Sequence, residues 1–471
     1  HARHSATCFN SGLLIRNFTE MSTVETEKPE AKLLSRLFKS LNNAGVHYAV
    51  MRNYETLPYS AAGSDLDLLI DPQQEQDAMH CIASAVRDAQ GVAIGHVRTA
   101  GLRKVFAFGK PDNPENPWWG LRIDICVGVV YRGSSNLLDE SVWTEHVKDH
   151  NGIKVLSHDM ASVLGVLKEF LHNGNNGQRY MEHASRAADT GWDSISMALS
   201  PLGGMALNNL RELCLGNIEG KEVRSHATRT RREIEWSSLQ AAPWGYLCNK
   251  SLYYGSRALR FLRPPGKMIA LLGTDGSGKS TVIDAIKPSL MDATHKAMRI
   301  KHLRPGLLPP LGRIKDREHD ATIKAANPHA DPPSGYLLSL VRLAYYFLDY
   351  TLGYWLQVRP VLAKSPTLVL YDRYAHDIML DPKRVRIKLP QWILRVFVNL
   401  VPQPDLIICL HAAPEVLAGR KQELPADEIK RQVNDLKAFA EREKKAVPVN
   451  TEATLIESRN QVFESIFDLC A

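Results

Sequence analysis

A glycine-rich segment in the second half of the chain has the residue types and spacing needed to hold phosphate groups. It matches Gly-x4-Gly-Lys-Ser and lies between an apolar run and a stretch of helical periodicity. Glycines let backbone N–H groups close around phosphates, while Lys279 can reach the β and γ oxygens and the Ser280 hydroxyl can bind Mg²⁺. We call residues 273–280 the phosphate-binding loop. The expected nucleotide-binding residues are Gly273, Asp275, Gly276, Ser277, Gly278, Lys279, Ser280 and Thr281.

A second reactive pair, Asp372 and Arg373, directly follows the apolar run 367–371. A doubly wound sheet binds its ligands at the carboxyl edge of its strands, so this pair is expected near the phosphate-binding loop. The carboxylate can face a metal or an acceptor, and the guanidinium can face an acceptor phosphate. A surface salt bridge is the alternative interpretation.

A third group of acidic residues lies in the first half of the chain. Asp65 and Asp67 are two residues apart in an expected strand, so their carboxylates share one face. Asp124, in a later apolar strand, can complete the cluster. Clustered carboxylate oxygens suit Mg²⁺. The candidate metal ligands are therefore Ser280, Asp65, Asp67 and Asp124.

The second half of the chain alternates between apolar runs of strand length and stretches of helical spacing. This alternation predicts an α/β fold with a doubly wound parallel sheet. A long irregular insertion is expected at 305–335. Strands are expected at 268–272, 298–302, 367–371, 405–410 and weakly at 454–456, and helices from 279, at 336–362 and 391–400, across 414–445 and from 458.

The first half predicts an α+β arrangement, a mixed sheet followed by a helical tail. Helices are expected from 31 to about 43, at 74–90 and after Ser157, and strands at 46–51, 66–70, 92–98, 103–108 and 121–128.

The length of 471 residues favours two or three domains. Residues 1–30 are expected to be disordered or non-native. The charged segment 216–266, poor in long periodic runs, is expected to connect a domain at 31–215 with one at 267–471.

Composition narrows the function classes. Hydrophobic residues make up 44% and charged residues 23%, which is ordinary for a globular protein. The net charge of +7 favours anionic partners without choosing among them. Seven scattered cysteines without a Cys-x-x-Cys pair indicate reduced thiols, a cytoplasmic location and no transition metal. The apolar stretch 336–362 contains Arg342, Asp349 and Arg359, so we expect a core helix and no membrane span.

Several motifs in residues 267–471 together resemble thymidylate kinase, a nucleoside monophosphate kinase family. The resemblance implies ATP, Mg²⁺ and a phosphorylated small-molecule acceptor, with the Asp-Arg pair contacting the acceptor and basic residues forming a lid. It implies catalytic roles for Lys279, Asp372, Arg373 and Arg420, and lid roles for Lys421 and Arg431. The motifs are the phosphate-binding loop with Thr281, Asp372-Arg373-Tyr374, Pro404-Asp405-Leu406-Ile407, Pro414-Glu415-Val416 and Arg420-Lys421.

The acceptor stays open because two motifs of the thymidylate kinase family are missing. Residues 303–306 only echo its Thr-Arg-Glu-Pro segment, no thymine-reading Ser-Arg pair is visible, and a basic strip stands at 376–386. This strip could hold a differently shaped phosphorylated acceptor or form a solvated loop. Such fusions resemble proteins of bacterial surface polysaccharide synthesis, so a sugar- or glycan-linked acceptor is an alternative. Another is an ATP-switched binding protein without turnover. A nucleic-acid partner is not favoured.

Residues 31–215 resemble the nucleotidyltransferase fold typified by DNA polymerase β. The resemblance implies metal binding by Asp65 and Asp67, with Asp124 as a further ligand and base. The family's Gly-Ser pair is replaced by Arg52-Asn53, and Lys168 is a candidate phosphate contact. An active nucleotidyltransferase, a degenerate binding or regulatory module, and a coincidental strand all remain open.

Overall fold

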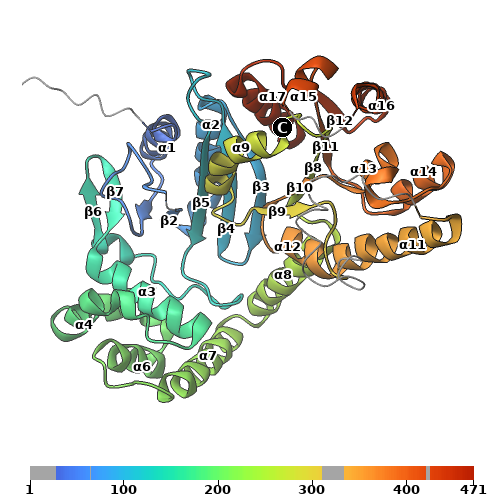
Figure 1. The fold of residues 1–471 in the computed structure, drawn as a ribbon. Helices are drawn as coiled ribbons and strands as arrows, with labels where there is room; N and C mark the ends of the chain where they lie inside the picture. Colours follow the sequence, from blue (N-terminus) through green and yellow to red (C-terminus); the bar gives the residue numbers. More distant parts are fainter. Residues whose placement is uncertain (1–27, 64, 310–333, 421–424) are drawn as a thin grey trace, which may run out of the picture.

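The computed structural model describes residues 28–63, 65–309, 334–420 and 425–471 (Figure 1). Most of segment 1–30 and most of the expected insertion at 305–335 therefore lie outside the described residues. Two β-sheets organise the rest of the chain, one in each half.

A seven-stranded mixed sheet forms the first half, in the order β3-β4-β5-β2-β1-β7-β6. Strand β2 runs parallel to β5 and β1 runs parallel to β7, whereas the other neighbours are antiparallel. The expected mixed sheet is confirmed. Its elements are α1 (Ala31–Asn43), β1 (Tyr48–Val50), β2 (Leu66–Ile70), α2 (Glu75–Asp88), β3 (Gly91–Thr99), β4 (Leu102–Gly109), β5 (Trp119–Val127), β6 (Val147–His150) and β7 (Ile153–Leu156).

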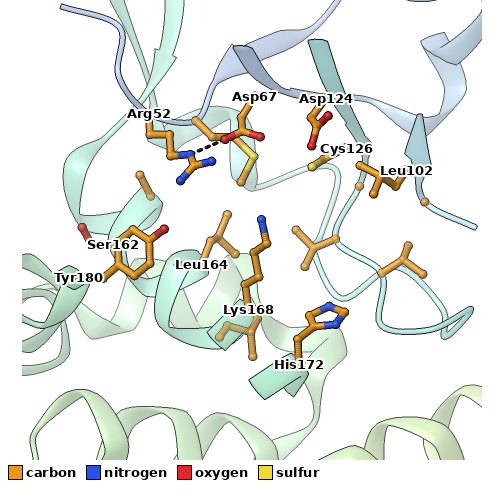
Figure 2. A pocket seen from close by; sticks show the side chains of 18 of the residues that line it. Arg52, Asp67, Leu102, Asp124, Cys126, Ser162, Leu164, Lys168, His172 and Tyr180 are labelled. Carbon is orange, nitrogen blue, oxygen red and sulfur yellow. Dashed lines mark hydrogen bonds and ion pairs between the residues drawn. The ribbon is translucent and has the colours of Figure 1, made fainter. Parts of the chain in front are cut away.

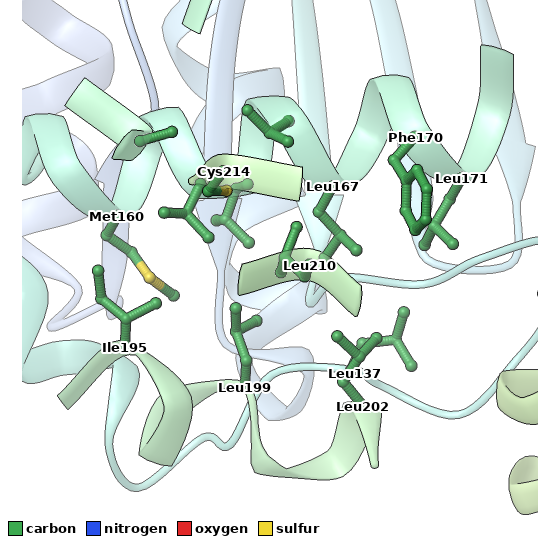
Figure 3. Close-up of a cluster of buried hydrophobic side chains, with 14 of the residues drawn as sticks. Leu137, Met160, Leu167, Phe170, Leu171, Ile195, Leu199, Leu202, Leu210 and Cys214 are labelled. Carbon is green, nitrogen blue, oxygen red and sulfur yellow. The ribbon is translucent and has the colours of Figure 1, made fainter. Parts of the chain in front are cut away.

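A helical unit follows the sheet, as expected. Its core is built from side chains of α3, α5 and α6, among them Met160, Ile195 and Leu210 (Figure 3). The helices are α3 (His158–Asn173), α4 (Met181–Thr190), α5 (Trp192–Ala198), α6 (Gly204–Cys214) and α7 (Glu222–Ala241).

The segment 216–266, expected to be a connector poor in periodic structure, consists mainly of two twenty-residue helices, α7 and α8 (Pro243–Leu262). Helix α7 belongs to the helical unit, since Val223, Ala227 and Ile234 are part of its core. These apolar positions are few and the chain between them is strongly charged. A helical period carried by so few side chains is weak in the sequence.

A five-stranded parallel sheet in the order β12-β11-β8-β10-β9 organises the second half. With a phosphate-binding loop after β8, this is a P-loop NTPase fold, as expected. Its elements are β8 (Lys267–Gly273), α9 (Lys279–Ala293), β9 (Arg299–His302), α11 (Tyr336–Gly353), a π-helical turn (Tyr354–Val358), α12 (Arg359–Lys364), β10 (Leu368–Asp372), α13 (Ala375–Leu380), α14 (Gln391–Leu400), β11 (Leu406–His411), α15 (Pro414–Arg420), α16 (Ala426–Arg442), β12 (Ala446–Asn450) and α17 (Leu455–Cys470).

The prediction of a weak strand at 454–456 is wrong. Thr454 caps α17 through a capping box with Glu457, and both residues exchange hydrogen bonds there. The last strand is β12, an edge strand that contains Pro448. A proline inside a strand lowers its sequence signal, although an edge position tolerates it.

Helix α11 continues through the π-helical turn into α12, close to the single helix expected at 336–362. Among the residues that the structure describes, no helix is both long and apolar enough to cross a membrane.

One hydrophobic cluster is built from residues of both halves. Helices α9 and α17 pack on the side of the first sheet formed by β3, β4 and β5 (Figure 1). The Trp118 ring stacks on Phe463 with centroids 4.9 Å apart and planes 15° from parallel. At Gly120, an added Cβ would lie 2.4 Å from the Ser289 carbonyl oxygen of α9. This close approach fixes the position of α9 against β5.

Replacing Trp118 with alanine should destabilise both halves together, because its ring is 4% exposed and lies in their shared core. We expect a loss of about 3–5 kcal/mol in the free energy of unfolding. Limited proteolysis of the full chain, read by mass spectrometry, should then release peptides from both halves at the same rate. Increased cleavage of only one half would contradict the shared core. Trp244→Ala is the matched control, since that side chain is 81% exposed and its loss should change stability by no more than about 0.5 kcal/mol.

Candidate active sites

The phosphate-binding loop joins the end of β8 to the first turn of α9. Gly276 and Gly278 have φ angles of +81°, a backbone conformation that residues with a Cβ rarely adopt. At Gly273, an added Cβ would lie 2.5 Å from the Ser277 hydroxyl oxygen. The Ser277 hydroxyl is buried and has no hydrogen-bond partner among the described residues. The conformation of the loop therefore requires glycine at these positions. The Ser277 hydroxyl remains available to hydrogen-bond a ligand.

Lys279 is buried at the start of α9. Its Nζ donates hydrogen bonds to the carbonyl oxygens of Gly273 and Thr274, both at 2.8 Å. Burial lowers the pKa of Lys279 to about 7, and the charge of Arg373 acts in the same direction. An anion placed in the loop would favour the charged ammonium and raise that pKa again.

Arg373 is 5% exposed and has an unusual backbone φ of +69°. Its guanidinium donates to Asp377 at 2.7 Å and to Asp275 of the phosphate-binding loop at 2.6 Å. Arg384 also donates to Asp275. The expected contact of Arg373 with an acceptor phosphate stays a prediction, because in this structure two carboxylates hold the guanidinium.

Asp372 lies at the end of β10, beside His302 at the end of the parallel strand β9. The Nδ1 atom of His302 lies 3.2 Å from Oδ2 of Asp372. Burial alone would raise the pKa of Asp372, but the His302 contact and the charge of Lys279 outweigh it and lower that pKa. Oδ1 has no hydrogen-bond partner among the described residues. His302 was missed from the sequence, although its place at a strand end could have indicated it.

One pocket of about 540 Å³ collects most of the predicted kinase residues. Arg420 reaches it from α15 and donates to the Thr451 carbonyl oxygen at 2.8 Å. The pocket also contains Arg384 from the basic strip. Its lining includes Asp275, Gly276, Gly278, Lys279, Ser280, Thr281, His302, Asp372, Arg373, Arg384, Arg420, Thr451, Ala453, Leu455 and Ser458.

The two other predicted lid residues do not join this pocket. Arg431 lies on α16, where it pairs with Glu428 and Asp435, and it is not among the lining residues. Lys421 lies outside the described residues. Arg384 supplies a basic group that the resemblance did not assign.

The predicted acidic cluster of the first half is brought together. Asp67 of β2 and Asp124 of β5 are directly paired in the parallel register. One carboxylate oxygen from each of these residues and from Asp65 lies within 4.8 Å of the others, and all three oxygens belong to buried side chains. This spacing fits a divalent cation held by several carboxylates.

Three cations balance the three carboxylates. Arg52 donates to Asp67, and Arg122 and Lys104 donate to Asp124, at 2.7 and 2.8 Å. Burial raises the pKa of Asp67. Burial would also raise the pKa of Asp124, but hydrogen bonding by Arg122 and the charge of Lys104 outweigh it, so that pKa is lowered.

A pocket of about 410 Å³ opens beside the cluster and extends to helix α3. Lys168, the candidate phosphate contact, lines this pocket, and its amine points from α3 toward Asp67 and Asp124 (Figure 2). Cys126 is also there, but burial raises the pKa of its thiol to about 12, which disfavours the reactive thiolate. The pocket therefore has acidic residues on the sheet side and a lysine on the helix side.

No protein-family model and no curated protein sequence matches the chain. Two similar solved structures are thymidylate kinases. The enzyme from Candida albicans is 17% identical, with a TM-score of 0.31, over 43% of this chain and 91% of its own. The enzyme from Ehrlichia chaffeensis is 12% identical, with a TM-score of 0.31, over 42% of this chain and 97% of its own.

Asp124→Asn should destabilise the protein at neutral pH, because it leaves Arg122 and Lys104 without their nearest buried counter-charge. We expect a loss of about 3–5 kcal/mol in the free energy of unfolding, measured in urea. The folded pKa of Asp124 lies below its unfolded value, so its contribution is present above the unfolded pKa and disappears as pH falls through the folded pKa. The difference between variant and wild type should therefore shrink in acid.

The surface variant Asp149→Asn is the control for this measurement, since Asp149 pairs with Lys154 in solvent. It should leave stability unchanged. Equal effects of the two substitutions would show that the cluster around Asp124 is not a stabilising charge network.

Proposed function

We propose that the second half of the chain is an ATP- and Mg²⁺-dependent kinase that transfers a phosphoryl group to a phosphorylated small-molecule acceptor. The observation that supports this most directly is the buried Lys279 on a glycine-built loop, in one pocket with Asp372, Arg373 and Arg420. Phosphoryl transfer depends mainly on positioning and on neutralising charge at the phosphoryl oxygens. A pocket with several cations around a phosphate-binding loop meets that requirement.

Each residue has a proposed task in this reaction. Lys279 binds the β and γ oxygens of ATP, and Arg420 neutralises charge on the transferred group. Ser280 is the residue that would hold Mg²⁺, and the ion would supply charge neutralisation at the phosphates. Asp372, with one carboxylate oxygen unpartnered among the described residues, faces the metal or the acceptor.

The proposed acceptor site is the side of the pocket formed by Arg373 and Arg384. Both guanidinium groups are bound to Asp275. An acceptor phosphate would compete with this carboxylate for the same hydrogen bonds, and guanidinium groups bind both anions in the same paired geometry. This selects acceptors that carry a phosphate and leaves open whether a nucleoside, a sugar or a glycan is attached.

The test is ATP consumption by the full chain with Mg²⁺ and a panel of nucleoside monophosphates, sugar phosphates and phosphorylated glycans. The full chain is required because the two halves share a core. We expect turnover with one acceptor class and a fall of at least about 100-fold in kcat for Lys279→Met, since a charge at the transferring group is lost. Lys287→Met, an exposed position on the same helix, should retain activity.

ATP binding without turnover on any acceptor would overturn the kinase proposal. Steeply salt-dependent binding of polyanions in the same protein would then favour the alternative, an ATP-switched binding protein.

For the first half we propose a nucleotidyltransferase-like, divalent-metal-dependent site. The specific observation in its favour is the convergence of Asp65, Asp67 and Asp124 beside a pocket that contains Lys168. In this proposal the carboxylates hold Mg²⁺, which supplies charge neutralisation at an attacked phosphate. Lys168 binds the phosphate, and Arg52 adds a positive charge at the position where the family has its Gly-Ser pair.

Metal binding can be tested by titrating the full chain with Mn²⁺ and a nucleoside triphosphate, using electron paramagnetic resonance to count bound ions. The titration is done with Ser280→Ala as background, which removes the proposed ligand of the other site. The further double substitution Asp65→Asn and Asp67→Asn should abolish the remaining bound ion. Asp77→Asn with Asp88→Asn, two exposed acids of α2, is the matched control. Retention of the ion in the first double variant would contradict this site.

A further inference from the structure

Helix α8 presents its apolar side to solvent. None of its twenty residues is buried, and the Trp244 and Leu262 side chains are 81% and 70% exposed. Its exposed apolar residues are spaced so that they occupy one side of the helix. They are Trp244, Leu247, Leu252, Tyr254, Leu259, Phe261 and Leu262.

The polar side of α8 faces the rest of the protein instead. Lys250 donates to Glu235 of α7 at 2.5 Å, and the backbone at Asn249 lies against Gly133. The half-buried positions of the helix are mostly polar or aromatic: Tyr246, Asn249, Lys250, Tyr253, Ser256 and Arg260. This is the reverse of the usual orientation of an amphipathic helix on a globular protein. Hydrophobic burial among the described residues therefore does not account for the apolar side of α8.

The orientation of α8 is fixed at its carboxyl end. Arg359 of α12 donates to the carbonyl oxygen of Phe261 at 2.7 Å and also to that of Leu262. The Phe261 ring lies 6.3 Å from that of Trp355 in the π-helical turn. The exposed apolar side of α8 thus meets that of α11 and its continuation, which comprises Leu337, Leu338, Val341, Leu348, Leu352, Trp355 and Leu356.

The charge of this region has one sign. From residue 236 to residue 274 the sequence contains no aspartate or glutamate. It contains five cations over the same span: Lys250, Arg257, Arg260, Arg263 and Lys267. On α11 and its continuation the one acid, Asp349, is buried and paired with Arg304. Lys250 is paired with Glu235 of α7 and Arg260 is half-buried, so the exposed charged side chains on α8 and directly after it are Arg257 and Arg263, both positive.

We propose that α8 and the adjoining exposed side of α11 dock the protein on an anionic membrane surface. An apolar side with tryptophan and tyrosine, bordered by arginines, is suited to lie in the plane of a lipid interface. Leucine and tryptophan side chains enter the boundary between headgroups and acyl chains, while Arg257 and Arg263 contact lipid phosphates.

A second copy of the chain fits this surface less well. A two-fold contact through α8 would place the same patch of each copy face to face. The exposed Arg257 and Arg263 of one copy would then approach the same residues of the other, and like charges placed together are unfavourable in an interface. An anionic lipid surface supplies the missing negative charge as well as the apolar environment.

The test is co-sedimentation of the full chain with vesicles of phosphatidylcholine, with or without phosphatidylserine. We expect binding to the vesicles that contain phosphatidylserine, weaker binding to pure phosphatidylcholine, and weakening by salt. The double variant Leu252→Glu and Leu259→Glu should lower the bound fraction at least about tenfold, because it places charge in the apolar side. Both positions are exposed, so folding should be retained.

The matched control is Met197→Glu with Met205→Glu, two similarly exposed apolar residues of α5 and α6. It should bind vesicles like the wild type. Equal loss in both double variants would overturn the proposal, because the effect would then be that of net charge alone. Lack of vesicle binding, together with a wild-type dimer in analytical ultracentrifugation that Leu252→Glu and Leu259→Glu dissociate, would assign the surface to a second copy.

Discussion

The packing of α9 against β5 is the contact on which both halves depend. Helix α9 begins with Lys279 and Ser280 at the phosphate-binding loop, and β5 carries Asp124 of the acidic cluster. Gly120 allows the helix backbone to approach the strand so closely that a methyl group would not fit. This helix–strand contact therefore links Lys279 and Ser280 of one candidate site to Asp124 of the other. A displacement of α9 would change the geometry of both sites.

Much of the local structure could be predicted from the sequence, because regular apolar spacing shows both the type of an element and which of its sides is buried. The joining of Asp65, Asp67 and Asp124 was predictable for the same reason, since alternation along a strand decides which side chains share a face. Helix α7 was not expected, because a few apolar side chains hold it in the core. The strand β12 was missed because Pro448 weakens its pattern.

The shared core and the pairing of charges could not be read from the sequence. A buried residue such as Phe108 or Trp118 looks the same in a sequence whether it packs within its own half or against the other. Arg373 and Asp275 lie 98 residues apart and meet only because β8 and β10 are neighbours. The sequence identified basic groups able to bind phosphate. The fold shows that two of them, Arg373 and Arg384, are already bound to the Asp275 carboxylate.

The acidic cluster of the first half, with Arg52, Lys104 and Arg122 against three aspartates, has formal charges that cancel. A bare divalent ion would add two positive charges to a buried and already balanced group, which is electrostatically costly. A polyphosphate bound together with the metal ion would supply negative charge that offsets this cost. We therefore expect the proposed site to bind the ion together with a nucleotide more readily than the ion alone.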